Sequence, residues 1–75
     1  MKEEIIRLIQ EINEYEDFED DTDLFAKDIL DSMSLVLLIG NIEEKFNIFI
    51  PEELVTRENC STVEAIVRMV GSLKE

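Results

Sequence analysis

The sequence predicts an all-α protein, a small four-helix bundle built from three main helices and one short helix. Three segments, residues 2–14, 32–46 and 61–73, repeat their apolar residues at helical spacing. Residues that break helices are scarce, with two glycines and one proline in 75 residues. No apolar segment has a second segment suited to pair with it as a strand. We therefore expect residues 1–75 to form a single domain with one small core.

The first predicted helix covers residues 2–14, and a long loop follows it over residues 15–31. The helix carries an apolar stripe of Ile5, Leu8, Ile9 and Ile12, with Ile6 beside it. The loop begins with an acidic run, residues 15–23, whose role the sequence leaves open between partner contact and solvation. We expect a short turn near residues 24–27 and apolar contacts that fix the loop to the core. The residues expected to make those contacts are Leu24, Phe25, Ile29 and Leu30.

The second predicted helix covers residues 32–46 and is apolar on two sides. The side expected to face the core carries Leu35, Leu38, Ile39, Ile42 and Phe46. The other side carries Met33, Val36, Leu37, Gly40 and Glu44. Either a partner or the long loop covers that second side, and we favour a partner because exposed apolar stripes mark interaction surfaces. Ser32 stands at the start of the helix, where serine is a good N-cap or first-turn residue.

Beyond the second helix, Pro51 disfavours a helical conformation at the residue before it. We expect residues 48–50 to form a buried connector, residues 52–56 a short helix or turn, and residues 57–59 a loop. The run from Ser61 to Glu64 has the form of a capping box, in which a serine is followed three residues later by a glutamate. It predicts the start of the last helix. The apolar face of that helix comprises Val63, Ile66, Val67 and Val70.

Charge narrows the range of partners. The net charge is −12, from nineteen acidic and seven basic residues. Phosphate backbones and anionic lipid surfaces would repel such a chain, so we expect no nucleic acid partner. Partners with basic surfaces fit better, although the charge can also serve solubility alone. Since no secretory signal and no apolar run of about 18 residues occurs, we expect a cytoplasmic protein without membrane insertion.

The residues offer little support for catalysis. The chain has no histidine, so neither a Ser-His nor a Cys-His pair can form, and we expect no catalytic residues and no enzyme. A calcium-binding EF-hand loop starting at Asp21 would need an oxygen ligand where Phe25 stands and a glycine where Ala26 stands. We therefore expect no metal site. The single cysteine, Cys60, cannot form an internal disulfide and is expected to be a semi-buried thiol.

The chain resembles the acyl carrier protein family in the order and spacing of its motifs over nearly all 75 residues. The matching segments are Asp23-Leu24-Phe25, Leu30-Asp31-Ser32-Met33, Ile42-Glu43-Glu44-Lys45-Phe46, Ile48, Ile50-Pro51-Glu52-Glu53 and Ser61-Thr62-Val63. The resemblance implies an acyl-carrier-like bundle whose Ser32 carries a 4′-phosphopantetheine arm. It also implies that Asp31 helps present the serine to a phosphopantetheinyl transferase. Acyl or aminoacyl groups would be held on the arm as thioesters.

The resemblance further implies a set of partner enzymes and a face for them. A loading enzyme and a downstream synthase or transferase would act on a monomeric carrier. In this family the second helix is the main recognition surface, which corresponds here to Met33, Val36, Leu37, Gly40, Glu43 and Glu44. The alternative is an unmodified acidic interaction module or regulatory subunit that uses the Met33 and Leu37 face.

The chain departs from the fatty-acid type of carrier near the serine. That type usually has acids two and five residues after it, where this chain has Ser34 and Leu37. It is more similar to free-standing carriers of peptide or polyketide assembly, or to D-alanyl carrier proteins of cell-wall modification. The Leu30-Asp31-Ser32-Met33 run resembles the latter. However, residues 55–59 lack the tryptophan that those carriers tend to have, so the subfamily stays open.

Overall fold

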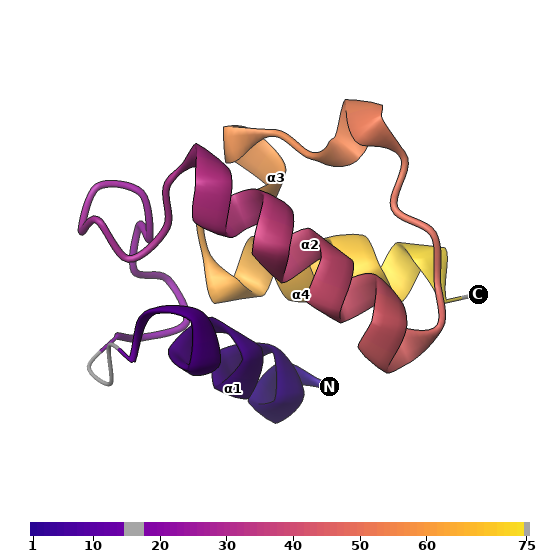
Figure 1. Ribbon diagram of the computed structural model, residues 1–75, viewed down its shortest axis with the longest axis horizontal. Helices are drawn as coiled ribbons and strands as arrows, with labels where there is room; N and C mark the ends of the chain where they lie inside the picture. Colours follow the sequence, from indigo (N-terminus) through magenta and orange to yellow (C-terminus); the bar gives the residue numbers. More distant parts are fainter. Residues whose placement is uncertain (15–17, 75) are drawn as a thin grey trace.

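The computed structural model describes residues 1–14 and 18–74, and its elements are all helical. They are α1 (Lys2–Asn13), α2 (Ser32–Phe46), the 3-10 turn η1 (Glu52–Leu54), α3 (Arg57–Cys60) and α4 (Val63–Leu73). Figure 1 shows α2 crossing the molecule, with α1 beside it and α4 behind it. No residue of the described ranges is in a strand, which confirms the all-α class. Within these ranges, no helix is long and apolar enough to cross a membrane.

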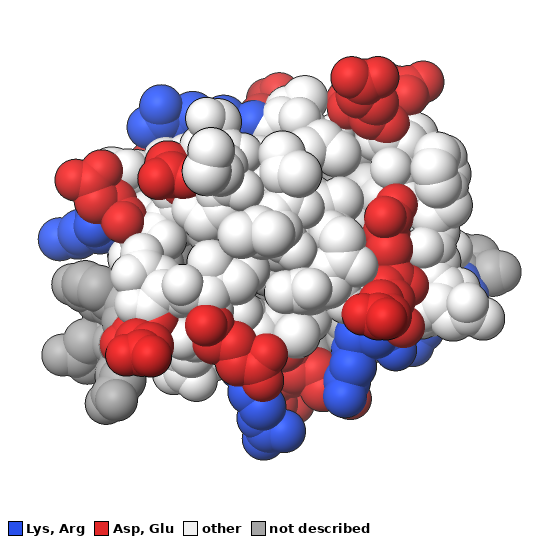
Figure 2. Space-filling model, in the orientation of Figure 1, with Lys and Arg blue, Asp and Glu red and all other residues white. Residues whose placement is uncertain are grey.

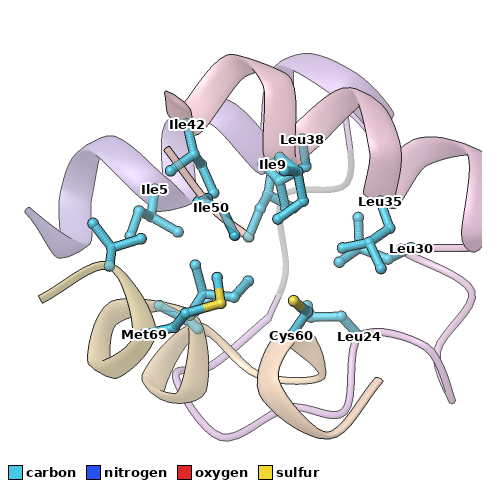
Figure 3. Close-up of a cluster of buried hydrophobic side chains, with 14 of the residues drawn as sticks. Ile5, Ile9, Leu24, Leu30, Leu35, Leu38, Ile42, Ile50, Cys60 and Met69 are labelled. Atoms are coloured by element: carbon cyan, nitrogen blue, oxygen red, sulfur yellow. The ribbon is translucent and has the colours of Figure 1, made fainter. Parts of the chain in front are cut away.

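The core is one cluster of apolar side chains that α1, α2, α4 and the long loop share (Figure 3). The helices contribute fully buried isoleucines, leucines and valines, among them Ile5, Ile9, Leu38, Ile42, Ile66 and Val70. Leu24, Ile29 and Leu30 from the loop are buried as well, which confirms that this segment is fixed to the core. Phe25 is only half-buried. The turn predicted near residues 24–27 is present, with hydrogen bonds from Lys27 N to Asp23 O and from Asp28 N to Phe25 O.

The two sides of α2 differ in burial as predicted. On the core side, Leu35, Leu38, Ile39 and Ile42 are buried, and Phe46 packs against the cluster half-buried. On the other side Met33, Val36 and Leu37 are 77%, 67% and 58% exposed. The described part of the long loop therefore does not cover that side, which leaves its apolar stripe open to solvent.

The connector after α2 is not wholly buried, and this corrects the prediction for Phe49. Asn47 ends α2 in the left-handed conformation, with φ of 57°, and non-helical backbone follows it. The backbone there directs the side chains of Ile48 and Ile50 toward the core, where they are half-buried and buried, and leaves Phe49 between them 75% exposed.

Residues 57–59, predicted as loop, belong to α3 instead. The threonine before them supplies the reason, because Thr56 Oγ1 accepts a hydrogen bond from Asn59 N at 3.2 Å and caps the short helix. Cys60 ends α3 and is fully buried rather than semi-buried.

The predicted capping box at Ser61 is also wrong, because Thr62 is the N-cap of α4. Thr62 is extended, with φ of −134°, and its Oγ1 accepts a hydrogen bond from Ala65 N at 3.0 Å. Ser61 is instead the C-cap of α3 and has a helical conformation, with φ of −77°, so its backbone does not have the extended conformation of an N-cap. The face of α4 that reaches the core includes Met69 in addition to the predicted residues, whereas Val67 is half-buried.

Candidate functional site

The start of α2 is organised by a capping box between Asp31 and Ser34. Asp31 Oδ1 accepts a hydrogen bond from Ser34 N at 2.8 Å, and Ser34 Oγ accepts one from Asp31 N at 3.0 Å. Asp31, with extended backbone at φ of −131°, is therefore the N-cap, and Ser32 is the first residue of the helix. Of the two roles considered for Ser32, the structure gives it the first-turn position.

This arrangement leaves the Ser32 side chain exposed and without a hydrogen bond to any described residue. The neighbouring hydroxyl differs, because Ser34 Oγ also donates to Asp31 Oδ1 at 2.7 Å and is thus engaged twice. The N–H and the hydroxyl of Ser34 lower the pKa of the Asp31 carboxyl. The site therefore consists of an accessible hydroxyl beside a carboxylate that stays ionised.

The segment before Ser32 is held firmly in place. The carbonyl of Leu24 accepts hydrogen bonds from Ile29 N at 2.8 Å and Leu30 N at 3.0 Å. From α1, Asn13 Nδ2 donates to Ile29 O at 2.6 Å and to Asp28 O at 3.3 Å. Asp28 lies in the left-handed region, with φ of 61°. These contacts present Ser32 at the edge of a rigid element rather than on a free loop.

Sequence reasoning missed Asn13, which satisfies two carbonyls of the loop from the end of a neighbouring helix. A weak signal exists in retrospect. Asparagine is a poor residue for a helix interior, and its side chain readily bonds to backbone groups near helix ends and turns. Nothing in the sequence identifies the loop as its partner, since the contact spans fifteen or more residues.

The predicted partner residues lie on α2 and continue from Ser32 along its exposed side. Met33, Val36, Leu37, Gly40 and Glu44 are all exposed. Glu43 is half-buried, and its Oε2 accepts a hydrogen bond from Ile50 N at 2.8 Å, so it also holds the connector to α2. Figure 2 shows an uncharged surface over α2, with acidic side chains and some basic ones around its edge. A groove beside this surface is lined by Val36, Ile39, Gly40, Glu43, Ile50, Glu52 and Val55.

The acidic loop and the cysteine serve the fold where the structure describes them. Asp20 Oδ2 pairs with Lys2 Nζ at 2.9 Å, and Asp23 Oδ1 accepts hydrogen bonds from Phe25 N and Ala26 N at 3.1 Å. Across residues 1–14 and 18–74, no three metal-ligating side chains gather into a candidate metal site. Burial raises the pKa of the Cys60 thiol, which favours its protonated form. Residues 15–17 of the predicted acidic run lie outside the described residues.

The comparisons with known proteins identify the family of this chain. Residues 3–70 match the family model described as "Phosphopantetheine attachment site". The chain belongs to this family and is a discrete carrier protein whose cofactor is 4′-phosphopantetheine. This supports the carrier interpretation over an unmodified interaction module.

Curated proteins that are similar to this chain include several D-alanyl carrier proteins. The chain is 35% identical to the D-alanyl carrier protein of Lactococcus lactis subsp. lactis (strain IL1403), over 100% of this chain and 98% of the relative. It is 35% identical to that of Listeria welshimeri, over 97% and 96% of the two chains. With that of Streptococcus sanguinis (strain SK36) the identity is 38%, over 99% and 95%. No solved structure matches the chain at a significant level.

The residues present fit the cofactor. Attachment needs a hydroxyl that an enzyme can reach, and Ser32 provides one. A phosphodiester bound there would lie at the first turn of α2, where backbone N–H groups lack helical partners and the helix dipole favours negative charge.

Proposed function

We propose that Ser32 carries the 4′-phosphopantetheine arm and that Asp31 helps present it to the phosphopantetheinyl transferase. The observation that supports this is the contrast between two adjacent hydroxyls. Ser34 is engaged by Asp31 in the capping box, whereas Ser32 is exposed and without a partner among the described residues. In the attachment step the Ser32 oxygen bonds to the phosphorus that bears pantetheine, and the diphosphate bond of coenzyme A breaks. Adenosine 3′,5′-bisphosphate leaves, and the serine proton passes to solvent.

The arm supplies a terminal thiol that holds cargo as a thioester, and we propose D-alanine as that cargo. Support comes from the D-alanyl carrier proteins, which are similar to this chain over nearly the full length of both. Peptide and polyketide carriers remain the competing subfamilies.

The proposed partners are the transferase, an enzyme that loads D-alanine and an enzyme that removes it. We propose that they bind the exposed side of α2, formed by Met33, Val36, Leu37, Gly40 and Glu44, with Glu43 at its edge. An apolar centre with acidic side chains around it suits partners with an apolar contact and a basic rim. The chain itself performs no catalysis in this proposal.

We further propose that residues 1–75 act as one monomeric carrier unit in the cytoplasm. The buried residues of α1, α2 and α4 share a single cluster, so no part of the described chain has a core of its own. A single free cysteine suits a reducing compartment.

The test is the intact mass of the protein before and after incubation with coenzyme A, Mg²⁺ and a broad-specificity phosphopantetheinyl transferase. We expect one phosphopantetheine on the wild type and on Ser34→Ala, and none on Ser32→Ala, whose circular dichroism spectrum should remain helical. Modification of Ser32→Ala would refute the attachment site. The cargo is tested next by incubating the modified protein with a D-alanine-activating enzyme, with L-alanine and a fatty acyl donor as matched controls.

A further inference from the structure

Arg57 lies near the proposed attachment site and is held by an aromatic ring. The guanidinium carbon of Arg57, the first residue of α3, lies 5.2 Å from the centroid of the Phe25 ring. This is a cation–π contact, which fixes the position of a long side chain that would otherwise be mobile. Arg57 has no ion pair within the described residues, where the three ion pairs involve only Met1 and Lys2 as cations. Most basic side chains of the described residues share that lack of an ion pair, so the contact with Phe25 is what distinguishes Arg57 from Lys27, the other basic residue of this region.

Backbone contacts place this arginine close to the start of α2. The carbonyl of Leu24 accepts hydrogen bonds from both Ile29 N and Leu30 N, so the turn that holds Phe25 folds back beside the residues that precede Ser32. Leu24 N also donates to Ser61 O at 2.7 Å, which joins the turn to the end of α3. Figure 3 shows Leu24 and Cys60 together below Leu30 and Leu35. Figure 1 agrees, with α3 beside the N-terminal end of α2.

A cation near the start of α2 would further stabilise an attached arm. The neighbouring carboxyl groups are Asp28 and Asp31, and hydrogen bonds from Ser34 keep the pKa of Asp31 low. A phosphodiester on Ser32 adds another negative charge to this group. An arginine suits that anion, because its planar guanidinium binds two phosphate oxygens at once and gives up little freedom when it is already held.

Lys27 is the other basic residue of this region. It is exposed in the same turn, but within the described residues it has no ion pair and no cation–π contact that would fix its side chain. A lysine also offers a point charge rather than a bidentate donor. The geometry therefore favours Arg57 as the residue that meets the phosphodiester.

We propose that Arg57, supported by the Phe25 ring, binds the phosphodiester oxygens of the arm on Ser32 and so fixes the root of the arm on the α3 side of α2. This inference rests on the proposed attachment at Ser32. Arg57 is a positioning residue, because it touches the root of the arm rather than the terminal thiol. The remainder of the arm stays free to reach partner enzymes.

The test compares unmodified and modified forms of four proteins: the wild type, Arg57→Gln, and the controls Lys27→Gln and Arg68→Gln. Each variant removes one positive charge, and Arg68 is exposed on α4 rather than on the turn or α3. For each protein we measure the change in Tm on modification, so that any structural loss of the contact with Phe25 cancels between the two forms. We expect this change to be lower in Arg57→Gln than in the wild type by roughly 2–5 °C, the size that an exposed charge pair produces in a domain of this length. Both controls should match the wild type.

A direct readout is nuclear magnetic resonance of the modified protein. We expect the Arg57 Nε–H resonance to move on modification, and the ³¹P resonance of the arm to differ between the wild type and Arg57→Gln but not Arg68→Gln. Arg57→Lys, which keeps the charge, should restore part of the change in Tm.

Three results would overturn the inference. Equal changes in Tm and equal ³¹P resonances in wild type and Arg57→Gln would show that Arg57 does not meet the arm. A smaller change in Tm on modification that occurs in Lys27→Gln alone would assign the contact with the phosphodiester to Lys27 and not to Arg57. If Ser32 gains no mass in the wild type, the attachment site fails and this inference fails with it, whereas normal modification without the Arg57 effect removes this inference alone.

Discussion

Gly40 offers a substitution whose effects on stability and on function should have opposite signs. Gly40 lies on the exposed side of α2 with several residues of helix on either side, where glycine costs about 0.5–1 kcal/mol relative to alanine. A Cβ atom built on Gly40 meets nothing within 4 Å, so the substitution carries no steric cost within the protein. Gly40→Ala should therefore stabilise the fold by about 0.5–1 kcal/mol, or about 2–8 °C in Tm for a chain of this length.

The same substitution should weaken partner recognition. Gly40 lines the groove between α2 and the segment around η1, and an added methyl group would narrow this groove for the partners that we propose to bind there. The assay combines urea unfolding of the unmodified protein with kcat/KM for phosphopantetheinyl transfer and for loading. We expect kcat/KM of at least one of these enzymes to fall several-fold.

Gly71→Ala is the matched control. Gly71 is also helical, lies on α4 and likewise leaves open space for a Cβ atom, so it should stabilise the fold by a similar amount without affecting either enzyme. A destabilised Gly40→Ala would refute the reasoning about helix propensity. A stabilised Gly40→Ala with unchanged kinetics for every partner would show that nothing approaches α2 closely at this position.

Three further comparisons test single residues. Leu38→Ala should lower the free energy of unfolding in urea by about 2–4 kcal/mol, because Leu38 is fully buried. Leu37→Glu should change this free energy by less than about 0.5 kcal/mol and slow the partner enzymes, because Leu37 is exposed. A large loss of stability in Leu37→Glu would contradict its exposed position. Thr62→Ala should lower the free energy of unfolding by about 1 kcal/mol through the loss of an N-cap, and Ser61→Ala should lower it much less. A larger loss in Ser61→Ala than in Thr62→Ala would show that Ser61 is the cap. The pKa of Asp31 is lowered in the folded state, so its contribution to stability is present above the pKa of an unfolded aspartate, about 3.9, and is lost as pH falls through the lower folded pKa. The difference in stability between the wild type and Asp31→Ala should therefore narrow below about pH 4. A difference that stays constant with pH would contradict the charge effect.

The helices that periodicity predicts are the ones that bury a stripe of large apolar side chains. The burial of Leu35, Leu38 and Ile42 follows from that spacing, and the bounds of α2 follow from Ser32 at its start and the stretch before Pro51 at its end. The predictions for short elements were wrong because those elements depend on which of two adjacent polar residues has an extended backbone. Ser61 and Thr62 both suit an N-cap, and the choice of Thr62 follows from the end of α3 just before it.

In the candidate site, too, features set by a local sequence pattern could be predicted and features set by tertiary contacts could not. The exposed apolar side of α2 could be predicted, since a helical wheel places Met33 and Leu37 away from the core. The capping box of Asp31 and Ser34 could also have been read from the sequence, although serine at its third helical position is a weaker signal than glutamate. In contrast, the contacts from Asn13 to the loop and from Arg57 to Phe25 join distant parts of the chain, and no local pattern indicates them.

The exposed stripe on α2 raises the question of what keeps two copies of the protein apart. Apolar residues such as Met33, Val36 and Leu37 on one helix form the kind of surface through which helices associate, but the net charge of −12 makes two copies repel each other. Salt screens this repulsion, because the Debye length falls from about 10 Å at 0.1 M to about 3 Å at 1 M, whereas it does not weaken the apolar contact.

We therefore expect sedimentation velocity to show a monomer at 0.1 M NaCl and a growing dimer fraction at 1 M NaCl. Leu37→Glu should remain monomeric at both salt concentrations, whereas Glu64→Gln, an exposed charge change on α4, should behave as the wild type. A wild type that stays monomeric at 1 M NaCl would show that the stripe is too small to hold a second copy. A stable dimer at 0.1 M NaCl would show that the charge does not protect it. Charge that repels copies of the chain while attracting basic enzymes would keep the face of α2 open for brief, sequential contacts, which a carrier requires.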